Sequence, residues 1–225
     1  NAAYGSERVP GWLYLPKKAT PPYQAVIYFP GSGALNQRDR LIVEWFVVTN
    51  GRALILPVFK GTYERGEGPS ARYLNNSNLY SDFVIQCSKD LGRTIDYLET
   101  RPDIRSDKLA FLGVSLGAVV GPVLAGVESR LKACVLVSGG INPRPVTPQV
   151  DQINFASRIT VPTLMLNGRY DFIFTEPSQR QLFRLIGTTP EHKRHLVFDV
   201  GHMVLNEHRT KETLDWLDRY LGPVR

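Results

Sequence analysis

The stretch from Leu109 to Gly121, "LAFLGVSLGAVVG", is the feature that most limits how this chain can fold. It begins as an unbroken apolar run, and such runs are typical of strands that are buried on both faces. It continues as a helix pattern of small residues that can pack closely on a sheet. Gly113, Ser115 and Gly117 lie at the junction. We therefore predict a buried strand that turns sharply into a helix, with a serine hydroxyl at the turn.

The rest of the chain repeats this alternation of apolar strands and helical patterns. The alternation predicts an α/β fold with a mostly parallel, doubly wound sheet and helices on both faces. The 225 residues suit one domain, residues 1–225, with little or no cap. Strands are predicted at 11–16, 24–31, 53–59, 108–115, 131–140, 161–168 and 193–200, and helices at 39–51, 79–101, 116–126, 176–187 and 206–222.

Composition and charge exclude several classes of function. The net charge is +6, but the 27 Lys and Arg residues are scattered and form no basic stripe, so we predict no nucleic-acid partner. No apolar run reaches the roughly 18 residues that a membrane span needs. Neither a span nor a signal peptide is visible, so we expect a cytoplasmic protein. Because the chain starts at Asn1 and not at Met, we also expect it to be processed or to be the C-terminal part of a longer protein.

The motif Gly113-x-Ser115-x-Gly117 has a specific physical purpose. A serine on a strained turn between a strand and a helix is lifted clear of the sheet, and the glycines remove side chains that would collide there. The backbone N–H of Leu116 would then point at the reacting atom, beside the positive end of the helix. The alternative is that Ser115 only caps the helix.

A serine hydroxyl is a poor nucleophile until a base takes its proton, and the base needs an acid to orient it. Asp171 follows the predicted strand 161–168, and His202 follows the last strand. The carboxyl ends of parallel strands form one rim, so Ser115, Asp171 and His202 are predicted to converge as nucleophile, acid and base. Alternatively, Asp171 and His202 are ordinary turn residues. Asp199 is the rival acid, but it is too close to His202 in sequence to brace it.

We predict neither a metal nor an organic cofactor. His192 and His195 have a spacing that could hold a metal, but no third ligand accompanies them. Cys87 lies in a helix pattern and Cys134 in a core strand, and both are expected to be buried free thiols.

The elbow "GVSLG", the acid turn "NGRYD", the histidine turn "GHMV" and the early "FPGSGA" resemble the α/β-hydrolase family. More narrowly, the chain resembles its dienelactone-hydrolase-like and acetyl-esterase-like branch. The runs "YERGEG" and "SKDLGRTIDYLETRPDI" are similar to hydrolase domains fused to bacterial serine/threonine kinases. Dienelactone hydrolases proper use a cysteine nucleophile, so Ser115 favours esterase chemistry.

This resemblance implies an oxyanion hole made by the backbone N–H groups of Leu116 and Ser32, with Gly33 as the second choice to Ser32. It also implies a serine carboxylesterase that acts on a small-molecule ester, short-chain or aryl, through an acyl-enzyme. The alternatives are a prolyl-oligopeptidase-like peptidase and a non-catalytic ligand-binding or regulatory module. Candidate residues for contacts with the substrate are Gly31, Gly33, Tyr63, Phe172 and Phe174.

Overall fold

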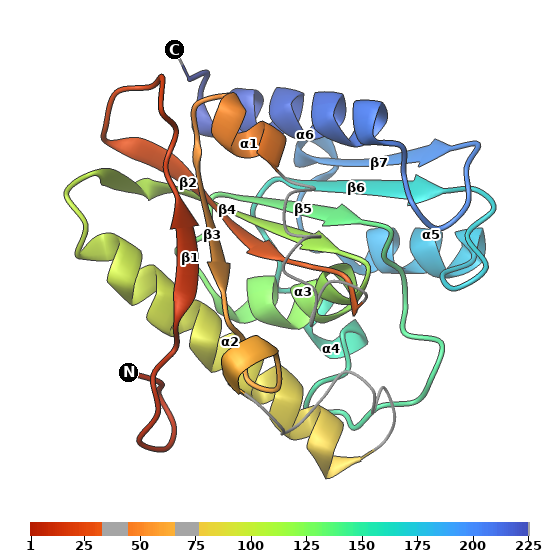
Figure 1. The fold of residues 1–225 in the computed structure, drawn as a ribbon. Coiled ribbons are helices and arrows are strands. Elements are labelled where there is room, and N and C mark those ends of the chain that lie inside the picture. The colour runs from red at the N-terminus through yellow and green to blue at the C-terminus, as the bar shows by residue number, and fades with distance from the viewer. Residues whose placement is uncertain (33–44, 66–76, 225) are drawn as a thin grey trace.

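The computed structural model describes residues 1–32, 45–65 and 77–224. Its strands form one seven-stranded sheet with the order β1-β3-β2-β4-β5-β6-β7 (Figure 1). β1 pairs with β3 in antiparallel fashion, and every other neighbouring pair is parallel. The predicted fold class is therefore confirmed. The strands are β1 (Gly11–Tyr14), β2 (Tyr23–Phe29), β3 (Ala53–Pro57), β4 (Ile104–Val114), β5 (Ala133–Val137), β6 (Thr163–Gly168) and β7 (Lys193–Phe198).

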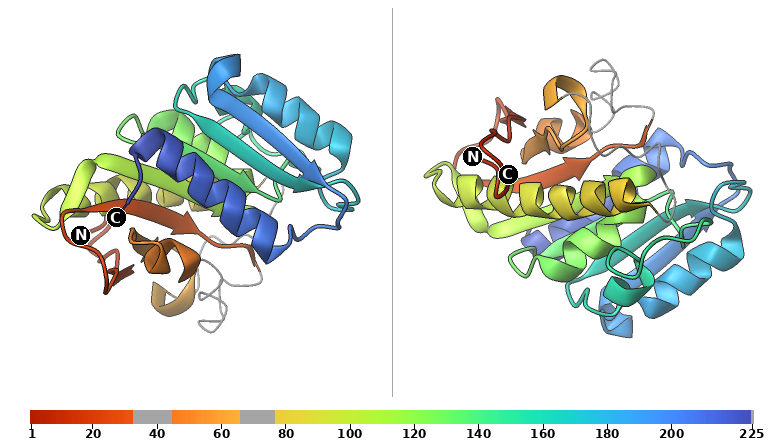
Figure 2. Two further views of the ribbon diagram at one scale, coloured as in Figure 1. Left: turned by 90° about the horizontal axis from the view of Figure 1, so that it is seen from above. Right: turned by 90° about the horizontal axis from the view of Figure 1, so that it is seen from below.

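Helices cover both faces of the sheet (Figures 1 and 2). In Figure 1, α1 and α6 lie above the sheet, while α2, α3 and α5 lie below it. The α-helices are α1 (Trp45–Thr49), α2 (Asn78–Glu99), α3 (Leu116–Val127), α4 (Ile153–Ala156), α5 (Glu176–Leu185) and α6 (Asn206–Leu221), and the 3₁₀ helices are η3 (Tyr63–Arg65) and η5 (Pro190–His192).

The sheet is buried on both faces, and this explains the unbroken apolar runs of the sequence. In β2, Ala25, Ile27 and Phe29 join the core beneath α2 and α3. Val26 and Tyr28 alternate with them and join the core beneath α1 and α6. Both cores need apolar side chains, so neither face of the central strands can carry a polar pattern.

Two elements differ from the sequence prediction. β4 begins at Ile104 and not at 108. The residues before Leu109 are mostly polar and gave no strand pattern, but Ile104 pairs with Tyr23 of β2 and starts the strand. Residues 141–160, for which the sequence predicts neither a strand nor a helix, contain α4. This helix packs against α3 so closely that a Cβ on Gly126 would lie 2.7 Å from the Phe155 carbonyl oxygen. Tertiary packing therefore stabilises a helix that the proline-rich sequence does not suggest. The first part of the predicted helix 39–51 lies outside the described residues.

Cys87 and Cys134 are free and buried, as predicted. Burial raises the pKa of the Cys134 thiol to about 12 and also raises that of Cys87. Both thiols are therefore structural. Each helix in the described part of the chain is too short or too polar to span a lipid bilayer.

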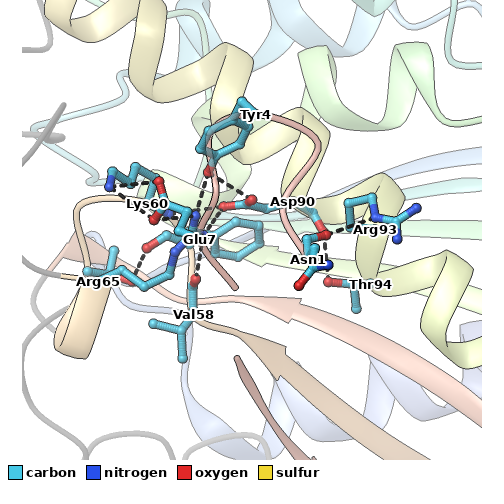
Figure 3. Close-up of polar contacts among 11 residues, drawn as sticks. Asn1, Tyr4, Glu7, Val58, Lys60, Arg65, Asp90, Arg93 and Thr94 are labelled. Carbon is cyan, nitrogen blue, oxygen red and sulfur yellow. Dashed lines mark hydrogen bonds and ion pairs between the residues drawn. The ribbon is translucent and has the colours of Figure 1, made fainter. Parts of the chain in front are cut away.

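A buried ion pair fixes the chain after β3 to α2 (Figure 3). Arg65 pairs with Asp90 and donates to the Val58 carbonyl at 2.9 Å and to the Tyr4 hydroxyl at 2.7 Å. That hydroxyl donates to Asp90 at 2.8 Å, and the Lys60 amide donates to the same carboxylate at 3.1 Å. The N-terminal segment and the chain after β3 thus both donate to one carboxylate on α2. Breaking such a pair from one side would leave a buried charge uncompensated.

The junction of β4 and α3 is packed without room for side chains at its two glycines. A Cβ on Gly113 would lie 2.3 Å from the Gly117 carbonyl oxygen, and one on Gly117 would lie 2.1 Å from the Phe29 carbonyl oxygen. These neighbours are backbone atoms of the sheet and the helix, so they cannot rotate away. The helix can approach the sheet this closely only with glycine at both positions.

We predict that Gly117→Ala lowers the free energy of unfolding by about 3 kcal/mol, because α3 must move away from β2 to admit the methyl group. Urea denaturation measures the change. The matched control is Gly92→Ala in α2, where the nearest neighbours of the added Cβ lie 3.8 Å away. That change should leave stability equal or raise it by up to about 1 kcal/mol. Native stability in Gly117→Ala would contradict the packing argument.

Candidate active site

Ser115 lies in a strained turn between β4 and α3. Its φ of +50° is in a region that non-glycine residues rarely adopt. The turn is held from the neighbouring strand, since the Ser115 amide donates to the Val137 carbonyl at 2.8 Å. Ser115 is itself partly exposed, whereas Val114 and Leu116 are buried. The strand, the turn and the small-residue helix follow the order that the sequence predicts.

Ser115, His202 and Asp171 form one chain of hydrogen bonds. The Ser115 Oγ lies 2.9 Å from His202 Nε2, and His202 Nδ1 lies 2.8 Å from Asp171 Oδ2. The Asp171 side chain is fully buried and that of His202 is 15% exposed. Three residues that are distant in sequence therefore meet in one place, at the carboxyl ends of β4, β6 and β7.

The Asp171 carboxylate is fixed by its own turn. Its Oδ1 accepts the amides of Ile173 at 2.8 Å and Phe174 at 3.0 Å, which leaves Oδ2 for His202. The rival acid, Asp199, pairs instead with Arg169 at 2.7 Å and is mostly exposed. The geometry therefore brings Asp171, and not Asp199, to the histidine.

The acid turn and the histidine turn are joined to each other. The Arg169 amide donates to the Phe198 carbonyl at 2.8 Å, and the Tyr170 amide donates to the Val200 carbonyl at 3.0 Å. A Cβ on Gly168 would lie 1.9 Å from the Gly201 carbonyl oxygen, so the two turns are in backbone contact. The two turns thus form a single backbone unit that sets the distance between Asp171 and His202.

The segment after β2 reaches the predicted nucleophile. A Cβ on Gly31 would lie 3.3 Å from Ser115 Cβ and 3.9 Å from its Oγ. Ser32 follows Gly31 and is exposed, and Leu116 begins α3, where the first amides have no partner within the helix. Gly33 lies outside the described residues. The oxyanion hole of Leu116 and Ser32 remains a prediction.

The aromatic candidates have different positions. Phe174 is buried, with its ring 5.9 Å from that of His202. Phe172, which is also next to Asp171, is 82% exposed. Tyr63 packs edge-to-face on Trp12 of β1, with ring centroids 5.2 Å apart. Of the three, Phe174 has a ring contact with His202, whereas Phe172 is exposed next to Asp171 in the sequence.

The remaining histidines serve other contacts. His192 lies 3.2 Å from the Tyr220 hydroxyl, and the ring of His208 stacks on Phe198. His195 Nε2 lies 3.1 Å from Asn167 Oδ1. Within the described ranges, no three His, Cys, Asp or Glu side chains are grouped so that they could hold a metal ion.

Asn167 is a buried residue at the end of β6 that the sequence analysis did not single out. Its Nδ2 donates to the Gly139 carbonyl at 2.7 Å, while its Oδ1 accepts from His195. It thereby ties β5, β6 and β7 together just before the two turns. The signal was available, because Asn167 is an amide at the end of the apolar run "TLMLNG", and an amide needs hydrogen-bond partners when it is buried.

We predict that His195 makes stability depend on pH. Burial lowers the pKa of His195 to about 4. In the unfolded chain the pKa is about 6.5. Between these values the unfolded chain binds a proton that the folded chain does not, so stability falls as the pH falls from 6.5 to 4. With a discount for partial exposure, we expect a loss on the order of 2 kcal/mol.

Urea denaturation at pH 7 and pH 4.5 measures this loss. His195→Gln keeps a donor for Asn167 and should lose less stability over that interval than the native protein. The exposed His192→Gln is the control and should behave like the native protein. Equal pH dependence of the native protein and His195→Gln would refute the assignment.

Similar solved structures share this fold at low identity. Acetyl xylan esterase from Paenibacillus sp. R4 has a TM-score of 0.72 and 18% identity, over 94% of this chain and 79% of its own. Est1E from Butyrivibrio proteoclasticus, solved with ferulic acid bound, has a TM-score of 0.73 and 13% identity, over 95% of this chain and 96% of its own. A putative dipeptidyl aminopeptidase IV from Bacteroides ovatus has a TM-score of 0.77 and 14% identity, over 98% of this chain but only 35% of its own.

No curated protein matches the sequence significantly. The similarity to hydrolase domains fused to kinases stays a prediction. Residues 9–216, nearly the whole chain, match the dienelactone hydrolase family. Together with the parallel seven-stranded sheet and its flanking helices, this match identifies the chain as an α/β-hydrolase-fold member of the dienelactone hydrolase family.

Proposed function

We propose that this protein is a serine carboxylesterase that hydrolyses short-chain or aryl carboxylic esters. The observation that carries the proposal is the unbroken hydrogen-bond chain from the Ser115 Oγ through His202 to the buried Asp171. A partly exposed hydroxyl on a strained turn, next to a histidine that a buried carboxylate orients, is the arrangement that nucleophilic catalysis needs.

In the first half of the reaction, the Ser115 Oγ attacks the ester carbonyl while His202 Nε2 takes its proton. Asp171 accepts from Nδ1–H and stabilises the positive charge of the imidazolium. The backbone N–H groups of Leu116 and Ser32 donate to the oxyanion. Losing one such donor typically costs about 3 kcal/mol of transition-state stabilisation. The C–O bond to the alcohol then breaks, and His202 gives its proton to the departing oxygen.

In the second half, water attacks the acyl-serine. His202 takes a proton from the water, and the same two N–H groups hold the new oxyanion. The bond to the Ser115 Oγ breaks, the oxygen regains its proton from His202, and the carboxylic acid leaves. No step of this sequence calls for a cofactor.

Relatives of known kind support ester chemistry. The family is one of hydrolases, and two structures of the same fold are named as an acetyl xylan esterase and as a protein that binds ferulic acid. The residue at the nucleophile position distinguishes this chain from dienelactone hydrolases proper, which carry cysteine there. Ser115 therefore directs the proposal toward ordinary esters.

A prolyl-oligopeptidase-like peptidase is the competing proposal, and the likeness to the Bacteroides ovatus protein is the observation that favours it. That protein is much longer, however, and this chain spans 35% of its length. The two proposals differ in the bond that Ser115 would cleave, so the ester and peptide substrates named below distinguish them.

We predict that the native protein hydrolyses p-nitrophenyl acetate and butyrate faster than the long-chain esters. Ser115→Ala should lower kcat by about 10⁵- to 10⁶-fold, the effect seen when a triad nucleophile is removed. Absorbance at the wavelength of p-nitrophenolate measures the rate. His192→Ala, which removes a histidine remote from the triad, should stay within about twofold of the native rate, as is usual for a surface substitution.

Equal rates for the native protein and Ser115→Ala would sink the esterase proposal. Proline-containing dipeptidyl p-nitroanilides would then distinguish the peptidase from a module that binds a ligand without turnover.

A further inference from the structure

Exposed apolar side chains concentrate on the two turns that carry Asp171 and His202. Eleven large apolar side chains are exposed among the described residues, and five of them belong to these turns. We call these five the apolar rim: Tyr170 (66% exposed), Phe172 (82%), Ile173 (39%), Met203 (52%) and Leu205 (49%).

The rim is built on fixed backbone. The carboxylate of Asp171 holds the amides of Ile173 and Phe174, and Phe174 is buried. On the other turn, Val204 is 2% exposed and packs in the core beneath α6, so its neighbours Met203 and Leu205 project outward. The exposure of the rim therefore does not come from a loose loop.

The two turns that carry the rim are joined to each other. Met203 directly follows His202, and Phe172 directly follows Asp171. His202 and Asp171 share a hydrogen bond of 2.8 Å. The backbone bond from Tyr170 to Val200 joins the turns a second time. Exposed apolar patches that are continuous with a reactive centre are typical of ligand-binding surfaces.

We infer that the apolar rim binds the alcohol part of the ester, and that the preferred substrates have a bulky, uncharged alcohol such as an aryl group. This inference rests on the proposed function. His202 gives its proton to the departing alcohol, so the alcohol must lie on the histidine side of Ser115. The rim belongs to the two turns that carry His202 and its partner Asp171, so it is on that side.

The charged side chains near the apolar rim are compatible with the binding of an uncharged alcohol group. Arg169, which precedes Tyr170, pairs with Asp199 at 2.7 Å and with Glu176 at 3.4 Å. Glu176 also pairs with Arg180. These charges are paired with one another, so an apolar ring can cover the rim without separating them.

The test keeps the acyl group constant and varies the alcohol. In the double variant Phe172→Ala/Met203→Ala, kcat/KM for 2-naphthyl acetate should fall about tenfold, because two large contacts with the ring are lost. For methyl acetate the change should stay below about twofold, since a methyl group is too small to cover the rim. Each variant is compared with the native protein on the same substrate, so differences in leaving-group reactivity cancel.

Val127→Ala is the matched control. Val127 is 50% exposed, like Met203, but it lies at the far end of α3 from Ser115. Val127→Ala should leave the ratio of kcat/KM for 2-naphthyl acetate to kcat/KM for methyl acetate unchanged. Thermal unfolding of each variant should match the native protein, because no buried side chain is altered.

A second measurement does not need turnover. In the Ser115→Ala background, 2-naphthol should bind about tenfold more weakly when Phe172 and Met203 are alanine, by the same loss of contacts. Equal binding of 2-naphthol, or an equal loss of kcat/KM for both acetates, would overturn the inference while leaving the esterase standing. Absence of ester hydrolysis in the native protein would overturn the proposed function itself.

The same variants test a lipid surface as the occupant. If the double variant loses binding to phosphatidylcholine vesicles but keeps the native preference among alcohols, the rim is a membrane-contact surface and the inference is wrong. The expected result is that neither protein binds the vesicles.

Discussion

The strained turn at Ser115 is the constraint on which the rest of the site depends. It is kept at a φ of +50° by the contact of Gly117 with Phe29 and by the hydrogen bond from Ser115 to Val137. These contacts come from β2 and β5, the two strands beside β4. The parallel order of the sheet then brings the turns after β6 and β7 to the same edge. A local strain is thus maintained by the whole sheet, and its result is a hydroxyl aimed at a histidine.

Much of this could be predicted from the sequence because the information is local. Unbroken apolar runs require strands that are buried on both faces, and a serine between two glycines requires a turn. Asp171 and His202 could be selected because each directly follows a predicted strand, and Asp199 could be set aside because it is too near His202 in the chain. The start of β4 could not be predicted because it depends on pairing with Tyr23 of β2. The presence of α4 could not be predicted because it depends on packing against Gly126 of α3.

The direction of side chains within the acid turn was the hardest part to predict. The run "DFIF" contains two phenylalanines, and no periodic pattern tells which of them points inward. The Asp171 carboxylate decides it by accepting the amides of Ile173 and Phe174. This places Phe174 against His202 and leaves Phe172 outside. The ring of Tyr63 packs on Trp12 of the edge strand, and its contact with the substrate stays a prediction.

The central claim is that Ser115, activated by His202, is the nucleophile. The most direct measurement is mass spectrometry of the protein after treatment with diethyl p-nitrophenyl phosphate, which phosphorylates activated serines. The account predicts one diethylphosphoryl group, located on Ser115, and almost none in His202→Gln, because the hydroxyl then lacks its base. An unmodified native protein, or a label on another residue, would contradict it.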